Sequence, residues 1–337
     1  MFEYFRKPKR FGYLDYGSFI LCRTGKDYKI NSSISIIKTE PYPIIFDAGM
    51  TYDVLINAQK ALLSINKKPD QVKLLIISHY HPDHILNLVY IKRYFPKIRV
   101  IWHKNAYANL NTIPHKSTMY KKLKTNIRTI PNVFMYLPQY LEASYLNNIN
   151  KNYICEDNDY IPTLDDNLKL KVIHTPGHSS GHICLHDLSN KVLFLGDHLP
   201  YTPWLDISEN SIDYMISSIR KLLKLSTKDV EYSVRSHGNL ADNWKEIYPW
   251  EEEKKRFEDH LELILSSIDK ILIFLERTPK SIKEIAQHVL KNKDYMNYNS
   301  LMNFFFMPPN LSWIFSYLLK LQKENKVKQI GTKWVIT

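Results

Sequence analysis

Cysteine, glycine and long apolar runs are all scarce in this sequence. Its 337 residues include three cysteines, Cys22, Cys155 and Cys184, which are widely spaced and never form a CxxC pair. This usage argues against a disulfide framework and fits a reducing compartment. The segment Met1–Phe11 lacks the apolar core of a signal peptide, and no stretch of about eighteen uncharged apolar residues follows it. We therefore expect a cytoplasmic protein without a membrane span.

Acidic residues are outnumbered by basic ones. The chain has 46 lysines and arginines against 34 aspartates and glutamates, which gives a formal net charge of +12. This balance favours anionic partners such as nucleic acid, phosphorylated metabolites or carboxylates. A plainer interpretation is a bias in composition, because asparagine, isoleucine and tyrosine are abundant as well and glycine occurs only nine times. The charge alone leaves both interpretations open.

Apolar residues are plentiful. Hydrophobic residues make up 44% of the chain and aromatic residues 13%, which is enough to fill a sizeable core and argues against global disorder. A chain of 337 residues exceeds one typical domain, so we expect a large unit with a smaller appendage.

Short β-rich runs and occasional helices alternate through the first two thirds of the chain. The predicted strands are Ser18–Arg23, Ser32–Lys38, Tyr42–Phe46, Val72–Ser78, Ile98–His103, Leu168–His174, His182–Asp187, Lys191–Leu195 and Glu231–Arg235. Predicted helices cover Val54–Ile65, Ile85–Tyr94 and Ile212–Leu223. This mixture predicts an α/β fold over residues 1–245, an αββα sandwich of two facing sheets with helices outside. Residues 111–164 fit no element, and we interpret them as an insertion near the active site.

The pattern becomes helical in residues 246–337. Predicted helices cover Glu251–His260, Leu261–Leu275, Ile282–Leu290 and a stretch from Pro309 to about Lys323, and a hairpin pattern follows at Lys326–Ile330 and Lys333–Ile336. Helices followed by a hairpin predict a smaller, winged-helix-like domain. Its last helix is too apolar to meet base edges, so we expect it to be buried against the rest of the chain or in a homodimer interface.

The motif with the clearest chemistry is His79-Tyr-His81-Pro-Asp83-His84. It comes directly after an apolar predicted strand and directly before a predicted helix. A loop at the end of a strand places several side chains on one side of a turn, where imidazoles and a carboxylate can converge on cations. Neutral imidazole and carboxylate are suitable ligands for zinc and similar divalent metals.

Three further polar residues follow apolar runs in the same way. His178 lies on a glycine-containing turn between two predicted strands, Asp197 ends the run Val192-Leu-Phe-Leu-Gly196, and His237 follows the predicted strand Glu231–Arg235. Strand ends of this kind expose functional groups along one rim of a β-sandwich. Together with the first motif, they make up a possible ligand set for metal.

With these motifs the chain resembles the metallo-β-lactamase superfamily, through HxHxDH at 79–84, TPGHSxGH at 175–182, GD at 196–197 and SHG at 236–238. The resemblance implies the αββα fold and a pair of divalent cations. It implies that His79, His81 and His178 bind one metal, that Asp83, His84 and His237 bind the second, and that Asp197 bridges them. It also implies that Asp47 in Asp-Ala-Gly49 orients a ligand, and we expect similar supporting roles, or contact with substrate, for His182 and His198.

The activity that the resemblance implies is hydrolysis of an ester, thioester or lactone by a metal-bound hydroxide, with Asp83 and Asp197 as the catalytic carboxylates. The presence of both His84 and Asp197 resembles thioesterases, lactonases and nucleases more than antibiotic-hydrolysing lactamases. Zinc is the default metal because histidine dominates the ligand set, and iron or manganese are alternatives. The carboxy-terminal pattern resembles a narrower group with a winged-helix domain, which includes an endoribonuclease branch. A metal-dependent ribonuclease acting on RNA is therefore the alternative function.

Candidate substrate contacts lie outside the ligand motifs. Tyr201 and Trp204 follow the bridging aspartate and would line the pocket or belong to the core. Lys121 and Lys122 lie in a basic part of the predicted insertion that would bind a phosphate or carboxylate, or would be a solvated loop.

Overall fold

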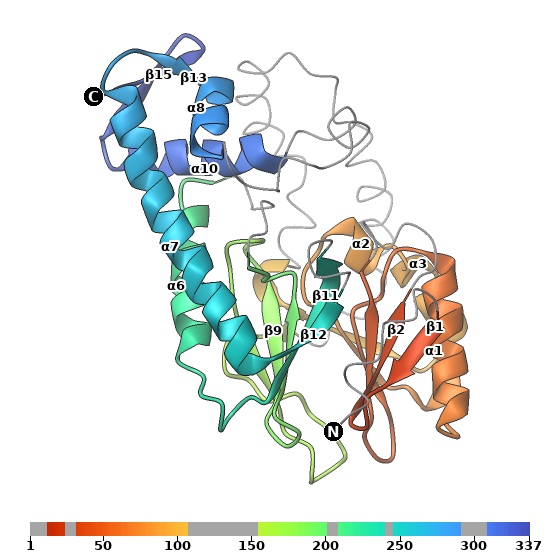
Figure 1. The fold of residues 1–337 in the computed structure, drawn as a ribbon. Helices are drawn as coiled ribbons and strands as arrows, with labels where there is room; N and C mark the ends of the chain where they lie inside the picture. Colours follow the sequence, from red (N-terminus) through yellow and green to blue (C-terminus); the bar gives the residue numbers. More distant parts are fainter. Residues whose placement is uncertain (1–11, 24–31, 107–153, 201–207, 240–244, 291–308) are drawn as a thin grey trace.

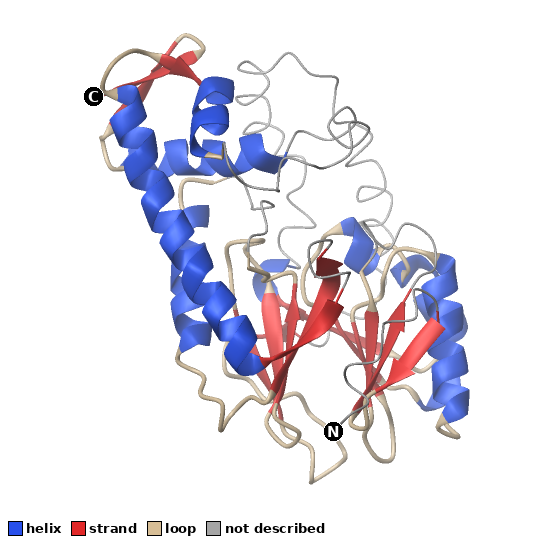
Figure 2. Cartoon of the chain, in the orientation of Figure 1, coloured by secondary structure: helices blue, strands red, loops and turns tan. Residues whose placement is uncertain are grey.

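Two β-sheets packed face to face form the centre of the molecule (Figure 1). The structure is a computed structural model, and it describes residues 12–23, 32–106, 154–200, 208–239, 245–290 and 309–337. Helices lie on the outer side of both sheets (Figure 2). The αββα arrangement predicted from the sequence is therefore observed, as mixed α/β sheets with helices outside.

The first sheet has seven strands that follow one another in chain order. They are β1 (Gly12–Asp15), β2 (Phe19–Arg23), β3 (Ile34–Ile37), β4 (Ile44–Phe46), β5 (Leu74–Ile76), β6 (Arg99–His103) and β7 (Ile154–Cys155). Pairing is antiparallel from β1 to β4 and parallel from β4 to β7. The carboxyl ends of β4, β5 and β6 therefore lie at the same edge of the sheet.

The second sheet has five strands in the order β12-β11-β10-β9-β8. They are β8 (Leu170–His174), β9 (Ile183–Asp187), β10 (Val192–Gly196), β11 (Tyr232–Asn239) and β12 (Lys245–Pro249). Only β10 and β11 pair in parallel, and their register shifts next to Gly196. This shift lies at the end of β10, where the Gly196-Asp197 motif begins.

Alternation along the strands explains why both faces of each sheet are covered. In β2, Phe19 and Leu21 point into the core between the sheets, whereas Ile20 and Cys22 lie in the core under the outer helices. In a strand successive side chains point to opposite faces, so a continuous apolar run predicts burial on both sides. Strand β10 follows the same pattern, with Phe194 between the sheets and Leu193 facing outward into a helix-covered core.

The outer helices complete the two layers. On the first sheet lie α1 (Tyr52–Ser64), a short 3₁₀ turn η2 (Pro69–Gln71), α2 (Pro82–Ile85) and α3 (Leu88–Tyr94), and on the second lie α6 (Ser211–Leu223) and α7 (Trp250–Leu275). The helix predicted over Ile85–Tyr94 corresponds to α3, which begins later, at Leu88, because the separate helix α2 ends at Ile85. The Asn87 side chain lies between them and donates to the carbonyl oxygens of Ala48 and Thr51, both at 2.9 Å.

The last part of the chain adds helices and a small sheet. It comprises α7, β13 (Lys280–Ser281), α8 (Ile282–Val289), α10 (Pro309–Lys323), β14 (Val327–Ile330) and β15 (Lys333–Ile336), and the sheet has the order β13-β15-β14. Helix α8 begins with a capping box: Ser281 Oγ accepts from the Glu284 amide, and the Glu284 carboxylate accepts from the Ser281 amide. The two helices predicted over Glu251–Leu275 are one continuous helix.

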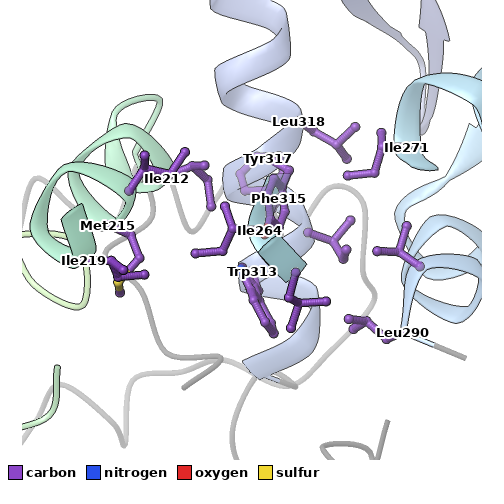
Figure 3. Packing of buried hydrophobic residues seen from close by; sticks show 14 of the residues in the cluster. Ile212, Met215, Ile219, Ile264, Ile271, Leu290, Trp313, Phe315, Tyr317 and Leu318 are labelled. Atoms are coloured by element: carbon purple, nitrogen blue, oxygen red, sulfur yellow. The ribbon is translucent and has the colours of Figure 1, made fainter. Parts of the chain in front are cut away.

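One apolar core joins this carboxy-terminal part to the second sheet. Figure 3 shows Ile212 and Met215 of α6 close to Ile264 of α7 and to Trp313 of α10. The same cluster reaches Leu195 at the end of β10. The predicted burial of the last helix is thus observed within the chain itself. The division into domains at residue 245 stays a prediction, and β12, which begins there, still pairs with β11.

Some predictions fall outside the described residues. Most of the segment 111–164 does so, and only its end is described, where β7 pairs with β6. In the described part of the chain, no helix combines the length and apolarity needed to cross a membrane.

Candidate metal centre

Four chain segments bring the proposed ligands to one end of the two sheets. His79, His81, Asp83 and His84 follow β5 and run into α2, His178 lies on the turn between β8 and β9, Asp197 follows β10, and His237 lies on β11. Figure 1 shows α2 and the end of β11 at this same end of the sheets. Side chains separated by up to 158 positions therefore meet because their strands end at one edge.

The first group consists of three histidines. His178 Nε2 lies 3.1 Å from His79 Nε2 and 2.8 Å from His81 Nδ1. One ring nitrogen from each histidine lies within 4.8 Å of the others. Three imidazole nitrogens that converge in this way form a suitable set of donors for one divalent cation.

The second group consists of two carboxylates and two histidines. Asp83 Oδ2 lies 2.8 Å from His237 Nε2 and 3.4 Å from His84 Nε2. Asp197 Oδ1 lies 3.2 Å from His84 Nε2 and 3.3 Å from His237 Nε2. These four side chains also offer donor atoms within 4.8 Å of one another.

Asp197 lies between the two groups. Its Oδ1 faces the second group, while its Oδ2 lies 3.6 Å from His178 Nε2 and 4.0 Å from His79 Nε2 in the first group. A carboxylate that presents one oxygen to each of two groups of donors has the geometry of a bridging ligand.

Two orphaned atoms test whether these residues fit a metal. His84 Nε2 and Asp197 Oδ1 are buried and have no hydrogen-bond partner among the described residues, although they lie only 3.2 Å apart. Buried polar atoms are nearly always paired, with protein, water or an ion. Divalent cations would satisfy both atoms, and five imidazoles with two carboxylates fit zinc, iron or manganese.

Asp47 fixes the orientation of one ligand. It accepts from the Ser78 amide (2.8 Å), the Ser78 hydroxyl (2.9 Å), the Ser236 hydroxyl (3.3 Å) and His84 Nδ1 (2.8 Å). Because His84 Nδ1 donates its proton to Asp47, Nε2 is the nitrogen that is left to bind a cation once its own proton is displaced. Asp47 has a φ of 64°, a left-handed conformation that aspartate tolerates better than most residues.

Ser78 fixes a second ligand and was not singled out from the sequence. Its hydroxyl hydrogen goes to Asp47, so its oxygen accepts from His79 Nδ1 at 2.9 Å. His79 Nε2 is then free of a proton and faces the first group. Ser236 has a similar place before His237. A small hydroxyl residue directly before a histidine ligand was the available signal in both cases.

In the metal-free protein, the histidines and carboxylates of the second group stabilise one another's charged forms. Burial lowers the pKa of His84, but Asp197, Asp83 and Asp47 outweigh it and raise this pKa well above its ordinary value. Against the same effect of burial, Asp197 and Asp83 raise the pKa of His237 to about 10. Although burial favours the neutral acids, these histidines lower the pKa of both Asp83 and Asp197.

The two histidines expected near the ligands occupy different places. His182 is buried beside Asp197 and accepts from its backbone amide at 3.0 Å. The His198 ring stacks on Phe257 of α7, with ring centroids 5.8 Å apart, and its centroid lies 5.9 Å from that of His182. Burial lowers the pKa of His198 to about 3, so this ring is neutral. The remaining candidates, Tyr201, Trp204, Lys121 and Lys122, lie outside the described residues.

Comparison with known proteins shows the family to which this chain belongs. A family model described as the metallo-beta-lactamase superfamily matches residues 28–237. The chain belongs to this superfamily, whose members are hydrolases.

Solved structures support the fold. A metallo-beta-lactamase family protein from Thermus thermophilus aligns with a TM-score of 0.70 over 96% of this chain and 99% of that one, at 15% identity. A beta-lactamase domain protein from Burkholderia ambifaria aligns with a TM-score of 0.69 over 96% of this chain and 94% of that one, at 14% identity. At such low identity these likenesses concern the fold only.

Curated relatives match shorter parts of the chain. The acyl-coenzyme A thioesterase MBLAC2 of Gallus gallus is 40% identical over 75 residues, which cover 21% of this chain and 27% of the relative. A hydroxyacylglutathione hydrolase of Pelagibacter ubique is 27% identical over 139 residues, which cover 38% of this chain and 56% of the relative. The matches thus span between about a quarter and just over half of these relatives.

Proposed function

We propose that this protein is a dinuclear metal-dependent hydrolase that cleaves an ester, thioester or lactone, with an acyl thioester as the preferred substrate class. The observation that carries the proposal is the position of Asp197, which presents one oxygen to each group of donors. Two relatives named as an acyl-coenzyme A thioesterase and a hydroxyacylglutathione hydrolase support the thioester class.

His79, His81 and His178 would hold one cation, Asp83, His84 and His237 the other, and Asp197 both. When bound, such a pair of cations lowers the pKa of water and polarises the carbonyl that is attacked. The residues of the chain do the remaining work. Asp47 and Ser78 set the tautomers of His84 and His79, and the carboxylate of Asp83 or Asp197 would take up the proton of the attacking water.

A basic protein suits an anionic thioester. The formal net charge of +12 would attract the phosphates of a coenzyme A ester or the carboxylates of a glutathione ester. We also interpret the segment from α7 to β15 as a winged-helix-like domain. Its helix α10 is buried in the chain, which supports a structural role and disfavours reading of nucleic acid. Zinc as the metal, a cytoplasmic location and a homodimer are further parts of this proposal.

The test is a substrate panel with metal analysis on the same sample. We expect turnover of acyl thioesters by protein that contains two cations per chain, and loss of turnover after chelation. At saturating thioester the kcat should hardly change between low and moderate salt, whereas binding to a phosphate backbone weakens steeply with salt. Hydrolysis of single-stranded RNA with steep salt dependence, and none of the thioesters, would favour the ribonuclease alternative. A protein that binds no metal would refute both.

A further inference from the structure

A closed series of buried hydrogen bonds surrounds the end of β10. Asp197 N donates to His182 Nε2 (3.0 Å), His182 Nδ1 lies 2.8 Å from Thr175 Oγ1, and Thr175 Oγ1 lies 3.4 Å from Cys184 Sγ. The Cys184 thiol donates to the carbonyl oxygen of Leu195 at 3.4 Å. The series therefore begins and ends within Leu195–Asp197, and its side chains are fully buried.

The direction of every hydrogen bond in this series follows from its two ends. A backbone amide can only donate, so His182 Nε2 must be the acceptor and His182 Nδ1 must carry the proton. At the other end the thiol uses its only hydrogen on the Leu195 carbonyl, so the Thr175 hydroxyl donates to the sulfur. Thr175 oxygen is then left to accept from His182 Nδ1. Both ends give the same neutral tautomer of His182.

The geometry at Gly196 makes this contact possible. Gly196 has a φ of +56°, and a Cβ added to it would lie 2.7 Å from His182 Nε2 and 2.9 Å from Ser78 Cβ. The missing side chain lets the imidazole reach the amide of Asp197. The backbone that carries Asp197 is thus held from one side by His182, while its carboxylate faces both groups of donors.

We infer that His182 is a positioning residue for Asp197, and that Thr175 and Cys184 set the tautomer with which His182 does this. The inference rests on the proposed function, because it assigns Asp197 to the metal centre. Both ring nitrogens of His182 are used in this series, so it would act without binding a cation itself. It acts by fixing the direction in which the carboxylate of Asp197 leaves the strand, and so the distance of each carboxylate oxygen from its donors.

Two substitutions at position 182 distinguish the effect of the hydrogen bond to Asp197 from the effect of side-chain volume. In His182→Gln the amide oxygen can occupy the place of Nε2 and accept from Asp197 N. In His182→Asn the shorter side chain keeps a donor for Thr175 but does not reach Asp197. His186→Asn is the matched control, because His186 is also buried in this segment and donates to the carbonyl oxygen of Asp229, at 3.0 Å.

The measurement is a calorimetric titration of each metal-free protein with zinc, together with its melting temperature and the kcat and KM of the loaded enzyme. We expect His182→Asn to bind zinc about 10–100-fold more weakly than wild type, with a similar fall in kcat and little change in KM. His182→Gln should recover most of the affinity, and His186→Asn should keep wild-type affinity even if its melting temperature falls.

Equal zinc affinities in His182→Asn and His182→Gln would overturn the inference, as would an equal loss in His186→Asn. If His182→Asn does not fold, Thr175→Val decides: weaker zinc binding supports the role of the tautomer, and unchanged binding overturns it. Failure of the wild type to bind two cations would refute the proposed function, and this inference with it. Normal binding by the wild type with equal binding by the variants would refute the inference alone.

Discussion

Asp47 shows how a single residue can hold several segments with proposed ligands together. Its carboxylate accepts four hydrogen bonds from three residues that precede or form the ligand segments, Ser78, His84 and Ser236. These contacts connect β4, the β5–α2 loop and β11 at one point. A loss of charge at this position should therefore disturb several ligands at once.

We predict that Asp47→Asn weakens metal affinity or activity by about 10–100-fold. Asparagine tolerates the left-handed backbone of Asp47, so the fold should be retained. Asp165→Asn is the control, because Asp165 also accepts from a hydroxyl and from backbone amides but does so far from the centre. Zinc titration of both variants checks the prediction, and equal affinities in the two variants would contradict it.

The ionisation of His84 and His237 gives a second prediction at the residue scale. Both pKa values are raised in the metal-free protein, that of His237 to about 10. Both rings are therefore positively charged at pH 7, with a proton on each nitrogen. A cation must displace these protons. Zinc binding at pH 7 should therefore release protons, and its affinity should rise with pH up to about 10. Calorimetry in buffers of different ionisation enthalpy measures the number released; none released would contradict the assignment.

The same raised pKa values affect the stability of the metal-free protein. A raised pKa stabilises the fold fully below the ordinary histidine pKa of about 6.5, and this contribution is lost as the pH rises through the folded value of about 10. The melting temperature of the metal-free protein should therefore fall between these two pH values.

At the scale of elements, the end of β10 depends on a glycine. Gly196 and Gly331 have nearly the same φ, +56° and +60°, but different surroundings. A Cβ at Gly196 would meet His182 and Ser78 below 3.0 Å, whereas one at Gly331 would meet nothing within 4 Å. The two positions thus separate the backbone requirement from the packing requirement.

We predict that Gly331→Ala destabilises the protein by about 1–2 kcal/mol, the cost of the left-handed conformation alone. Gly196→Ala should cost about 1–3 kcal/mol more, because the surroundings must also shift. Urea unfolding of the metal-free proteins measures both values. Equal free energies of unfolding for the two variants would contradict the close approach of His182 to Gly196.

The elements also show what the sequence could and could not predict. Long apolar runs such as β5 and β10 were located correctly, because burial on both faces leaves an uninterrupted signal. Strand β12 was not predicted, since its five residues are too few and too polar to show a period. The break between α2 and α3 was missed because it depends on contacts of Asn87 with a distant loop.

At the scale of the whole molecule, one core connects the candidate centre with the carboxy-terminal helices. Leu195, next to the Gly196-Asp197 motif, belongs to the same apolar cluster as Trp313 of α10. Ion pairing also joins the two parts, since Lys320 of α10 lies 2.6 Å from Asp213 of α6. We therefore expect the chain to unfold as one cooperative unit rather than in two steps.

Two isoleucines of α7 test this cooperativity. Ile264 is fully buried between α6 and α10, whereas Ile273 on the same helix is 61% exposed. Ile264→Ala should lower the free energy of unfolding by about 2–5 kcal/mol, and Ile273→Ala should change it by less than about 0.5 kcal/mol. In Ile264→Ala, zinc release and loss of helical circular dichroism should coincide. Zinc retained after the helices unfold would contradict the shared core.

The seven proposed ligands could be selected from the sequence, because each lies in a short motif at the end of an apolar run. Their mutual distances could not, since these depend on how the two sheets pack. The contacts of Thr175 and Cys184 were also beyond the sequence, because neither residue lies directly before a proposed ligand and nothing distinguishes its supporting role from an ordinary core position.

The most direct test of the central claim is anomalous diffraction at the zinc edge from a crystal of the full chain grown with zinc. We expect two peaks about 3.5–4 Å apart. One should lie among His79, His81 and His178, the other among Asp83, His84 and His237, with Asp197 contacting both. A single peak, or none between these side chains, would contradict the dinuclear centre.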